Sequence, residues 1–194
     1  MDQEGWLACA RHCPSPNYGE RPPGEVISLL VIHNISLPPG QYGGPEIEDF
    51  FCNRLDSQQH PYFQQIASMK VSAHGLIRRD GELVQFVSLL GRAWHAGRSC
   101  FEGRSECNDF SIGIELEGTD HEPYSEAQYR TLVTLTQTLM TLFPAICADR
   151  IVGHEHIAPG RKTDPGPGFD WQRYLKALCP MTRVATPPSI QGDC

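Results

Sequence analysis

The chain has 194 residues, of which 40% are hydrophobic and 20% charged, a composition that suits one globular domain with a single buried core. Its 16 Lys and Arg against 23 Asp and Glu give a formal net charge of −7, which disfavours nucleic acid and anionic membranes as partners. The apolar runs fall far short of the roughly 20 residues of a membrane span, and the first residues are acidic where a secretory signal is basic, so we expect a soluble, cytoplasmic monomer.

The first patterned segment is rich in proline and glycine. Residues 14–24 predict a stiff, turn-rich stretch, so residues 1–25 are expected to form a lead-in that packs on the main domain, residues 26–179. The apolar, β-branched run at residues 26–33 then predicts a central strand covered on both faces, with His33 at its end.

A helix and a hairpin follow in the chain. We predict a short helix at residues 46–54 and two strands at residues 72–78 and 83–87. The dipeptide Asp80-Gly81 between the two strands is a strong signal for a tight hairpin turn. Because a hairpin joins antiparallel strands, the predicted sheet is not all parallel.

Residues 111–117 alternate cleanly between two kinds of side chain. The even-numbered apolar residues point to one face of the predicted strand, and Gly113, Glu115 and Glu117 point to the other. One interpretation is an edge strand with one solvated face. The other is a site in which a carboxylate receives a proton from a water on a metal. The alternation does not decide between these interpretations.

The clearest helix is predicted at residues 126–142. Ser125 and Gln128 form a capping-box pattern at its start, and its apolar residues lie on one stripe that would pack on the sheet. A shorter helix, with Asp170 as its N-cap, is predicted at residues 171–178.

Strands interleaved with helices predict an α/β fold, a single domain with a mixed central β-sheet flanked by helices. Residues 159–168 are too rich in proline and glycine for a helix or a central strand. Residues 180–194 lack periodicity and are expected to be a flexible C-terminal tail.

The chain has eight cysteines, without the paired spacing of a zinc ribbon or knuckle. We interpret most of them as reduced thiols, with a disulfide framework as the less favoured alternative. Cys100 or Cys107 could formally act as a nucleophile with His95, but neither has a local context that marks it.

Histidines are the first candidates for chemistry. His33 lies where α/β folds place ligands, although a core histidine would fit the same position. Residues 153–168 bring together His154, Lys162 and Asp164 in a segment stiffened by proline. Imidazole and carboxylate ligands from separate segments are typical of a catalytic zinc, and a solvated surface loop is the alternative.

The remaining histidines are interpreted more simply. His95, beside Trp94, could line a sugar or peptide groove or occupy a packed corner. His74 is expected in the core, because a histidine on an inner strand is more often buried structure than a ligand. Three others lie in polar or turn surroundings and are expected at the surface: His12, His60 and His121.

Three segments together resemble the AmpD-type zinc amidases, which share their fold with peptidoglycan-recognition proteins. They are residues 31–40, residues 107–120 and residues 154–171, and the resemblance runs from about Trp6 to Leu178. It implies a mixed sheet flanked by helices, with a zinc groove on one face. It also implies hydrolysis of the lactyl–L-alanine amide of anhydro-muropeptides during cell-wall recycling, with an indirect effect on β-lactamase induction.

The resemblance assigns roles residue by residue. The ligands of one zinc ion per chain would be His33, His154 and Asp164. Glu115, rather than Glu117, would be the catalytic acid and base, and Lys162 would stabilise the oxyanion. The candidate substrate contacts are Asn34, Lys70, Trp94, His95 and Arg161.

Two departures from the family pattern bear on these expectations. The family commonly has Asp where this chain has His156, an extra imidazole that could disturb the metal site or face away from it. Relatives carry arginines at the positions of Lys70 and Glu106, which leaves the peptide specificity open. A domain that binds muropeptides without cleaving them is the competing hypothesis, and a periplasmic enzyme acting on intact wall is the alternative within the enzyme class.

Overall fold

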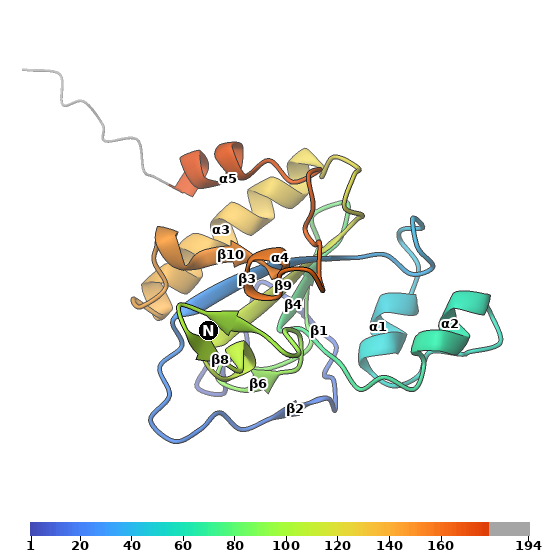
Figure 1. Ribbon diagram of the computed structural model, residues 1–194, viewed down its shortest axis with the longest axis horizontal. Coiled ribbons are helices and arrows are strands. Elements are labelled where there is room, and N and C mark those ends of the chain that lie inside the picture. Colours follow the sequence, from blue (N-terminus) through green and yellow to red (C-terminus); the bar gives the residue numbers. More distant parts are fainter. Residues whose placement is uncertain (179–194) are drawn as a thin grey trace, which may run out of the picture.

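The computed structural model describes residues 1–178 and is built on a six-stranded mixed sheet (Figure 1). In spatial order its strands are β1 (Arg11–His12), β5 (Leu83–Gln85), β4 (Gly75–Ile77), β9 (Ser111–Glu117), β3 (Leu29–Ile35) and β10 (Ile151–Gly153). Only β4 and β5 pair antiparallel, as the hairpin signal predicts, and the other pairs are parallel. The predicted α/β class with a mixed central sheet is confirmed.

Two central strands carry the positions that matter for the site. The register of β3 and β9 places His33 opposite Glu115, and all seven residues of β9 are buried. The edge-strand interpretation of residues 111–117 is therefore wrong, because β9 lies between β4 and β3.

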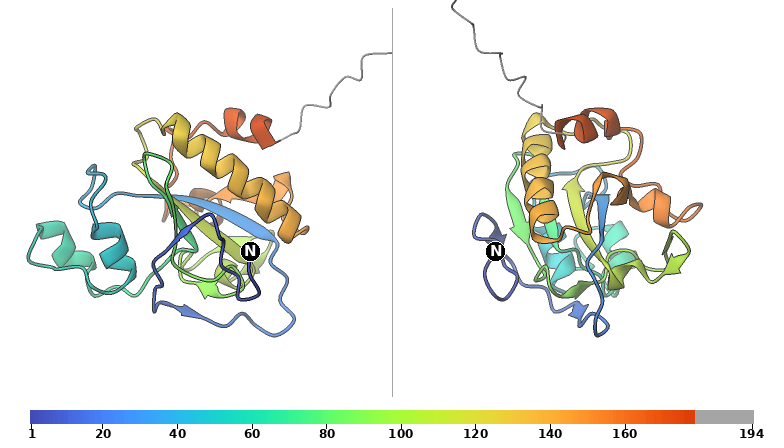
Figure 2. Two further views of the ribbon diagram at one scale, coloured as in Figure 1. Left: turned by 180° about the vertical axis from the view of Figure 1, so that it is seen from behind. Right: turned by 90° about the vertical axis from the view of Figure 1, so that its left-hand side faces the viewer.

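One face of the sheet is covered by α3 (Glu126–Leu142) and α5 (Trp171–Leu178), which lie side by side in Figures 1 and 2. Both helices have the predicted bounds. The capping box of Ser125 and Gln128 is formed, and Asp170 Oδ1 accepts a hydrogen bond from the Arg173 N–H at 2.9 Å. The core under these helices joins alternate apolar side chains of β3 and β9 to Leu132, Leu135, Leu139 and Tyr174.

A second core lies on the opposite face of the sheet, under α1 (Glu46–Phe51) and α2 (Pro61–Ile66), and it contains Leu76 and Val84, the alternate residues of β4 and β5. Figure 1 shows these two helices well separated from α3 and α5. The smaller elements are β2 (Tyr18–Gly19) with β6 (Arg92–Ala93), β7 (Cys100–Phe101) with β8 (Arg104–Ser105), the short helix α4 (His154–Ile157), and 3-10 turns at Cys107–Asp109 and Ala148–Arg150.

Several predicted boundaries are wrong. The strand predicted at residues 26–33 is β3, which begins only at Leu29, because Val26 is 60% exposed and lies outside the sheet. It also continues two residues past His33, the predicted end, because Asn34 and Ile35 still pair with β9. The helix predicted at residues 46–54 ends at Phe51, since Asn53 adopts a left-handed φ of 59° that no α-helix continues through. The strands predicted at residues 72–78 and 83–87 are the shorter β4 and β5, and α2, α4 and β10 were not predicted from the sequence.

The lead-in lies against the sheet through the pairing of β1 with β5 and through Leu7, which is buried in the core. The predicted tail at residues 180–194 lies outside the described residues. Within residues 1–178, no helix combines the length and the apolar character needed to cross a membrane.

Candidate metal centre and groove

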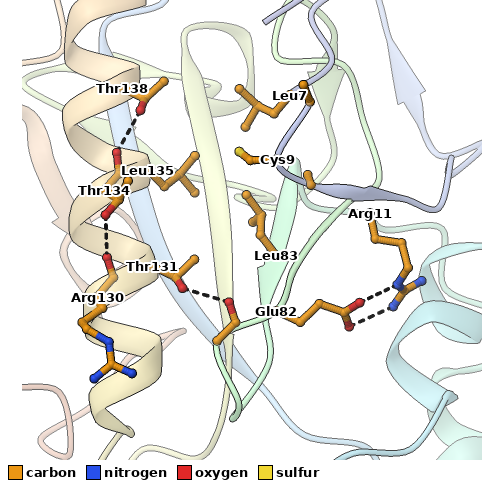
Figure 3. A pocket seen from close by; sticks show the side chains of 13 residues that line it. Leu7, Cys9, Arg11, Glu82, Leu83, Arg130, Thr131, Thr134, Leu135 and Thr138 are labelled. Atoms are coloured by element: carbon orange, nitrogen blue, oxygen red, sulfur yellow. Dashed lines mark hydrogen bonds and ion pairs between the residues drawn. The ribbon is translucent and has the colours of Figure 1, made fainter.

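Two hollows of the surface differ in their chemistry. A hollow of about 640 Å³ lies between the lead-in, the β4–β5 hairpin and α3 (Figure 3). It is lined by leucines and threonines, and its acidic group, Glu82, is paired with Arg11 at 2.8 Å. A second groove, of about 320 Å³, lies on the opposite face of the sheet from α3 and contains histidine, aspartate, glutamate and lysine side chains.

Three side chains from distant parts of the chain meet in this groove. His33 lies in β3, and β10 pairs with β3 so that Gly153 lies opposite Ile32. The next residue, His154, is thereby placed beside His33, while Asp164 comes from the loop that follows α4. The short parallel pairing of β10 with β3 at the edge of the sheet thus places the imidazole of His154 beside that of His33.

The donor atoms form a small triangle. His33 Nδ1 lies 3.0 Å from both His154 Nδ1 and Asp164 Oδ2, and the latter two atoms are 3.1 Å apart. In a tetrahedral zinc site, ligand atoms about 2.0–2.1 Å from the ion lie about 3.3 Å from one another. The triangle is close to that size, and these residues form the cluster within residues 1–178 that could hold a metal ion.

The positions of the ring protons of His33 and His154 also suit the binding of a cation. His154 Nε2 donates to the Ala96 carbonyl at 3.0 Å, so its Nδ1 carries a lone pair. His33 Nε2 faces His95 Nδ1 at 2.9 Å, and burial lowers the pKa of His33 to about 4, which keeps it neutral. Two lone pairs and a carboxylate oxygen at such distances repel one another, and a divalent ion between them removes that repulsion. Two nitrogens and one oxygen are the ligand set of a catalytic zinc.

Glu115 lies beside the triangle and is 9% exposed. Its Oε2 is buried without a hydrogen-bond partner among the described residues. Burial raises the pKa of the Glu115 carboxyl well above its ordinary value; the negative charge of Asp164 adds to the shift and the charge of Lys162 opposes it. A carboxylate held this way suits proton transfer.

Glu117 lies on the same face of β9 but has a structural environment. Its carboxylate pairs with Arg78 at 3.4 Å and accepts hydrogen bonds from the backbone N–H groups of Gly43 and Arg79. With its oxygens occupied, Glu117 fixes surrounding loops. The structure thus separates two glutamates that alternation left equivalent.

Five side chains were candidate substrate contacts, and three of them line the groove. These are Asn34, Trp94 and His95. The Asn34 amide donates to Asp120 Oδ1 at 2.8 Å and to the Pro165 carbonyl at 3.1 Å, which holds the loop behind Asp164. Both ring nitrogens of His95 lie against protein partners, so this ring is a component of the wall.

The other two candidates lie outside the groove lining. The guanidinium of Arg161 donates to the carbonyls of Ala96 and Arg98, both at 2.7 Å, and so ties two loops together. Lys70 is exposed, between Met69 and Val71, which both line the groove. Their role in substrate binding stays a prediction.

His156 does not join the triangle. It belongs to the helical turn of α4, where its Nδ1 accepts the Gly153 N–H at 2.9 Å and its ring packs edge-on against Trp171. Its side chain is 53% exposed, so the extra imidazole faces away from the cluster. Residues 154–157, at the start of the proline-stiffened segment 153–168, form the helical turn α4, which was not predicted from the sequence. Glu106, the other departure, pairs with Arg92 at 3.2 Å.

The other reactive candidates have simpler environments. His74 is fully buried, which confirms its expected place in the core, and Cys107 is a buried thiol whose pKa burial raises. His12 and His121 are exposed, and His60 caps α2. The six cysteines among residues 1–178 are free thiols, and the other two lie beyond them. The cysteine nucleophile thus gains no support.

Two residues of the site were not predicted from the sequence: Ser111, which contacts the His95 ring, and Asn108, which accepts the backbone N–H groups of His95 and Ala96. The signal for Ser111 was its place on β9, four residues before Glu115 and on the same face. For Asn108 no such signal exists, because its contacts depend on a turn that the sequence pattern does not mark.

The structure places a buried glutamate beside a two-histidine, one-aspartate cluster that could hold a metal ion, an arrangement typical of metallohydrolases. Comparison with known sequences is more specific: the profile of the N-acetylmuramoyl-L-alanine amidase family matches residues 23–167, and the chain belongs to that family. The resemblance inferred from the sequence is confirmed.

Relatives and solved structures agree with this assignment. The chain is 59% identical over 176 residues to the 1,6-anhydro-N-acetylmuramyl-L-alanine amidase AmpD of Enterobacter cloacae. This alignment covers 91% of this chain and 94% of that protein. A crystal structure of a selenomethionine AmpD derivative superimposes with a TM-score of 0.89 at 57% identity, over 92% of this chain and 99% of the other. The Escherichia coli amidase AmiD, solved in complex with anhydro-N-acetylmuramic acid-L-Ala-D-gamma-Glu-L-Lys, has a TM-score of 0.59 and 26% identity over 83% of this chain and 65% of its own.

Proposed function

We propose that this chain is a zinc-dependent amidase that hydrolyses the bond between the lactyl group of anhydro-N-acetylmuramic acid and the L-alanine of its peptide. The observation that carries the proposal is the donor triangle of His33, His154 and Asp164 beside the buried, unpartnered Glu115. The names of the AmpD relatives and the ligand in the AmiD complex support this substrate class.

Different residues of the groove carry out different steps of the proposed reaction. Zinc held by the triangle supplies Lewis acidity, which polarises a carbonyl and lowers the pKa of water. Glu115 takes the proton of the attacking water and delivers it to the alanine nitrogen as the C–N bond breaks. Its raised pKa makes the Glu115 carboxylate a stronger base for the first step than an ordinary carboxylate, and it lets the group hold the proton until the alanine nitrogen takes it.

Lys162 supplies the opposite charge. It lines the same groove as Glu115 and Asp164, and its charge acts on Glu115. As the carbonyl oxygen becomes negative, the ammonium group stabilises it, and the apolar walls from Phe50, Phe51 and Ile66 strengthen that attraction by excluding water.

A domain that binds muropeptides without cleaving them is the competing function. Such a domain needs neither a complete ligand set nor a buried carboxylate with a free oxygen. The presence of all three donors together with Glu115 and Lys162 favours the enzyme.

The deciding experiment incubates the zinc-loaded full chain with an anhydro-muropeptide and follows the release of the L-alanyl peptide by mass spectrometry. We expect release that a chelator abolishes and added zinc restores. If nothing is released and Glu115→Ala binds the ligand as tightly as the wild type does, the binding domain replaces the enzyme.

We extend the proposal to the metal content, oligomeric state, location and cellular effect of the enzyme. The enzyme would bind one zinc ion, act as a monomer on recycled cell-wall fragments in the cytoplasm, and indirectly affect β-lactamase induction. Light scattering of the purified chain tests the monomer, and fractionation of expressing cells tests the location.

A further inference from the structure

A chain of hydrogen bonds runs from His33 into the interior, away from the groove. His33 Nε2 lies 2.9 Å from His95 Nδ1, and His95 Nε2 lies 3.0 Å from Ser111 Oγ. Ser111 Oγ in turn lies 2.6 Å from the carbonyl oxygen of Cys107. All three side chains are buried.

The donor and the acceptor of every hydrogen bond in this chain follow from its last acceptor, the carbonyl oxygen of Cys107. A carbonyl oxygen only accepts, so the single hydroxyl proton of Ser111 is donated to Cys107. Ser111 must then accept from His95 Nε2, which carries a proton and leaves a lone pair on Nδ1 of a neutral ring. That lone pair accepts from His33 Nε2, so the Nδ1 of His33 presents its own lone pair to the donor triangle.

The backbone on either side of His95 fixes the second imidazole as well. The carbonyl of Ala96, the next residue, accepts from His154 Nε2 at 3.0 Å. A single atom, Asn108 Oδ1, accepts the backbone N–H groups of both His95 (3.2 Å) and Ala96 (2.8 Å). Both imidazoles of the triangle are therefore held from behind by one dipeptide.

The sequence of β9 makes room for this arrangement. The His95 ring lies over Gly113, and a Cβ at that position would overlap the ring. Ser111 and Glu115 stand on either side of Gly113 on the same face of the strand. Strand β9 therefore supplies Ser111 at the end of the hydrogen-bond chain, the space at Gly113 for the His95 ring, and the carboxylate of Glu115 in the groove.

We propose that His95 and Ser111 are positioning residues that fix the Nε2–H tautomer of His33, and so prepare the triangle for a metal before it binds. This inference rests on the metal site of the proposed function. In zinc sites, groups that orient a histidine ligand from behind typically contribute roughly 10- to 100-fold to metal affinity.

The test uses the metal-free full chain and four variants. Long-range ¹H–¹⁵N correlation spectra report the tautomer of each histidine, and competition with a chromophoric chelator reports the zinc affinity. Ser111→Ala removes the acceptor of His95, His95→Leu removes the acceptor of His33, and His95→Gln retains an amide oxygen that can accept from His33. Ser99→Ala is the matched control, because the buried Ser99 hydroxyl donates to the Gly97 carbonyl and accepts the Cys107 N–H but is hydrogen-bonded to neither His95 nor Ser111.

We expect Nε2–H tautomers at His33, His95 and His154 in the wild type. Ser111→Ala and His95→Leu should mix the tautomers of His33 and weaken zinc binding by roughly 10- to 100-fold, while His95→Gln and Ser99→Ala stay within about threefold of the wild type. A thermal unfolding scan identifies any variant that fails to fold, and the remaining variant of the pair then decides.

Two results would overturn the inference. One is an Nδ1–H tautomer at His33 in the wild type. The other is unchanged His33 tautomer and zinc affinity in the folded Ser111→Ala or His95→Leu variant. Because these readouts need no substrate, a zinc-loaded wild type that fails to cleave muropeptides refutes the proposed function and leaves this inference standing.

Discussion

Replacing Glu115 by glutamine is expected to change activity and stability in opposite directions. Burial raises the pKa of this carboxyl well above its ordinary 4.5, so the folded protein binds the proton more tightly than the unfolded chain does. The stabilisation by that proton is complete below pH 4.5 and is lost as the pH rises through the raised pKa. Glutamine has no charge to bury, so the variant should gain stability over the wild type as the pH rises.

The magnitude follows from the size of the pKa shift. Each pKa unit between the folded and unfolded states corresponds to about 1.4 kcal/mol. For a chain of this length, that is a rise of about 3 to 5 °C in Tm for each unit. The same substitution removes the proposed general base, which should lower kcat by a factor of roughly 10² to 10⁴.

Glu117→Gln is the matched control, because Glu117 lies two residues away on the same face but is paired. Neutralising it leaves Arg78 without this carboxylate and weakens two backbone hydrogen bonds, so the variant should lose about 1 to 3 kcal/mol at pH 7. Differential scanning calorimetry of the metal-free proteins between pH 4 and pH 8 measures both effects. A Glu115→Gln variant that is less stable than the wild type at pH 8, or equally stable across the range, would refute the burial argument.

Three further substitutions test the groove. Asp164→Asn removes the charged ligand of the triangle, so zinc affinity should fall more than roughly 100-fold in a chelator competition, and stoichiometric zinc retained after dialysis would contradict the assignment. Lys162→Met should lower kcat by roughly 10² to 10³ with little change in zinc affinity, and a purely KM effect would assign Lys162 to ground-state binding. His156→Asp should leave zinc stoichiometry and kcat within about twofold, because the ring faces Trp171, and a large gain in activity would show that the imidazole interferes.

The sequence predicted those elements whose signals are local. The helix at residues 126–142 has a capping box and an apolar stripe of several turns, and β9 alternates over its full length, so both have the predicted bounds. By contrast, β10 has only three residues, too few to show a period, and its place beside β3 is set by packing. The turn of α4 has only four residues and ends two residues before Pro159.

The site divides in the same way. The residues of the triangle could be proposed because histidine and aspartate have few roles in such surroundings, and a family resemblance joined the distant segments. Alternation could not distinguish Glu115 from Glu117, since the difference lies in Arg78 and two backbone groups from elsewhere. His95 was interpreted as a candidate substrate contact because its partner Ser111 lies 16 residues away, and the place of Ser111 on β9 does not by itself show that it reaches the His95 ring.

The walls and the floor of the groove rest on different hydrophobic cores. The aromatic wall from α1 and α2 rests on the core beneath those helices, whereas the floor that presents His33 and Glu115 is held by β3 and β9 against α3. Recognition of the ligand can therefore diverge between homologues, or be redesigned by exchanging residues 46–66, without moving the atoms proposed to perform hydrolysis.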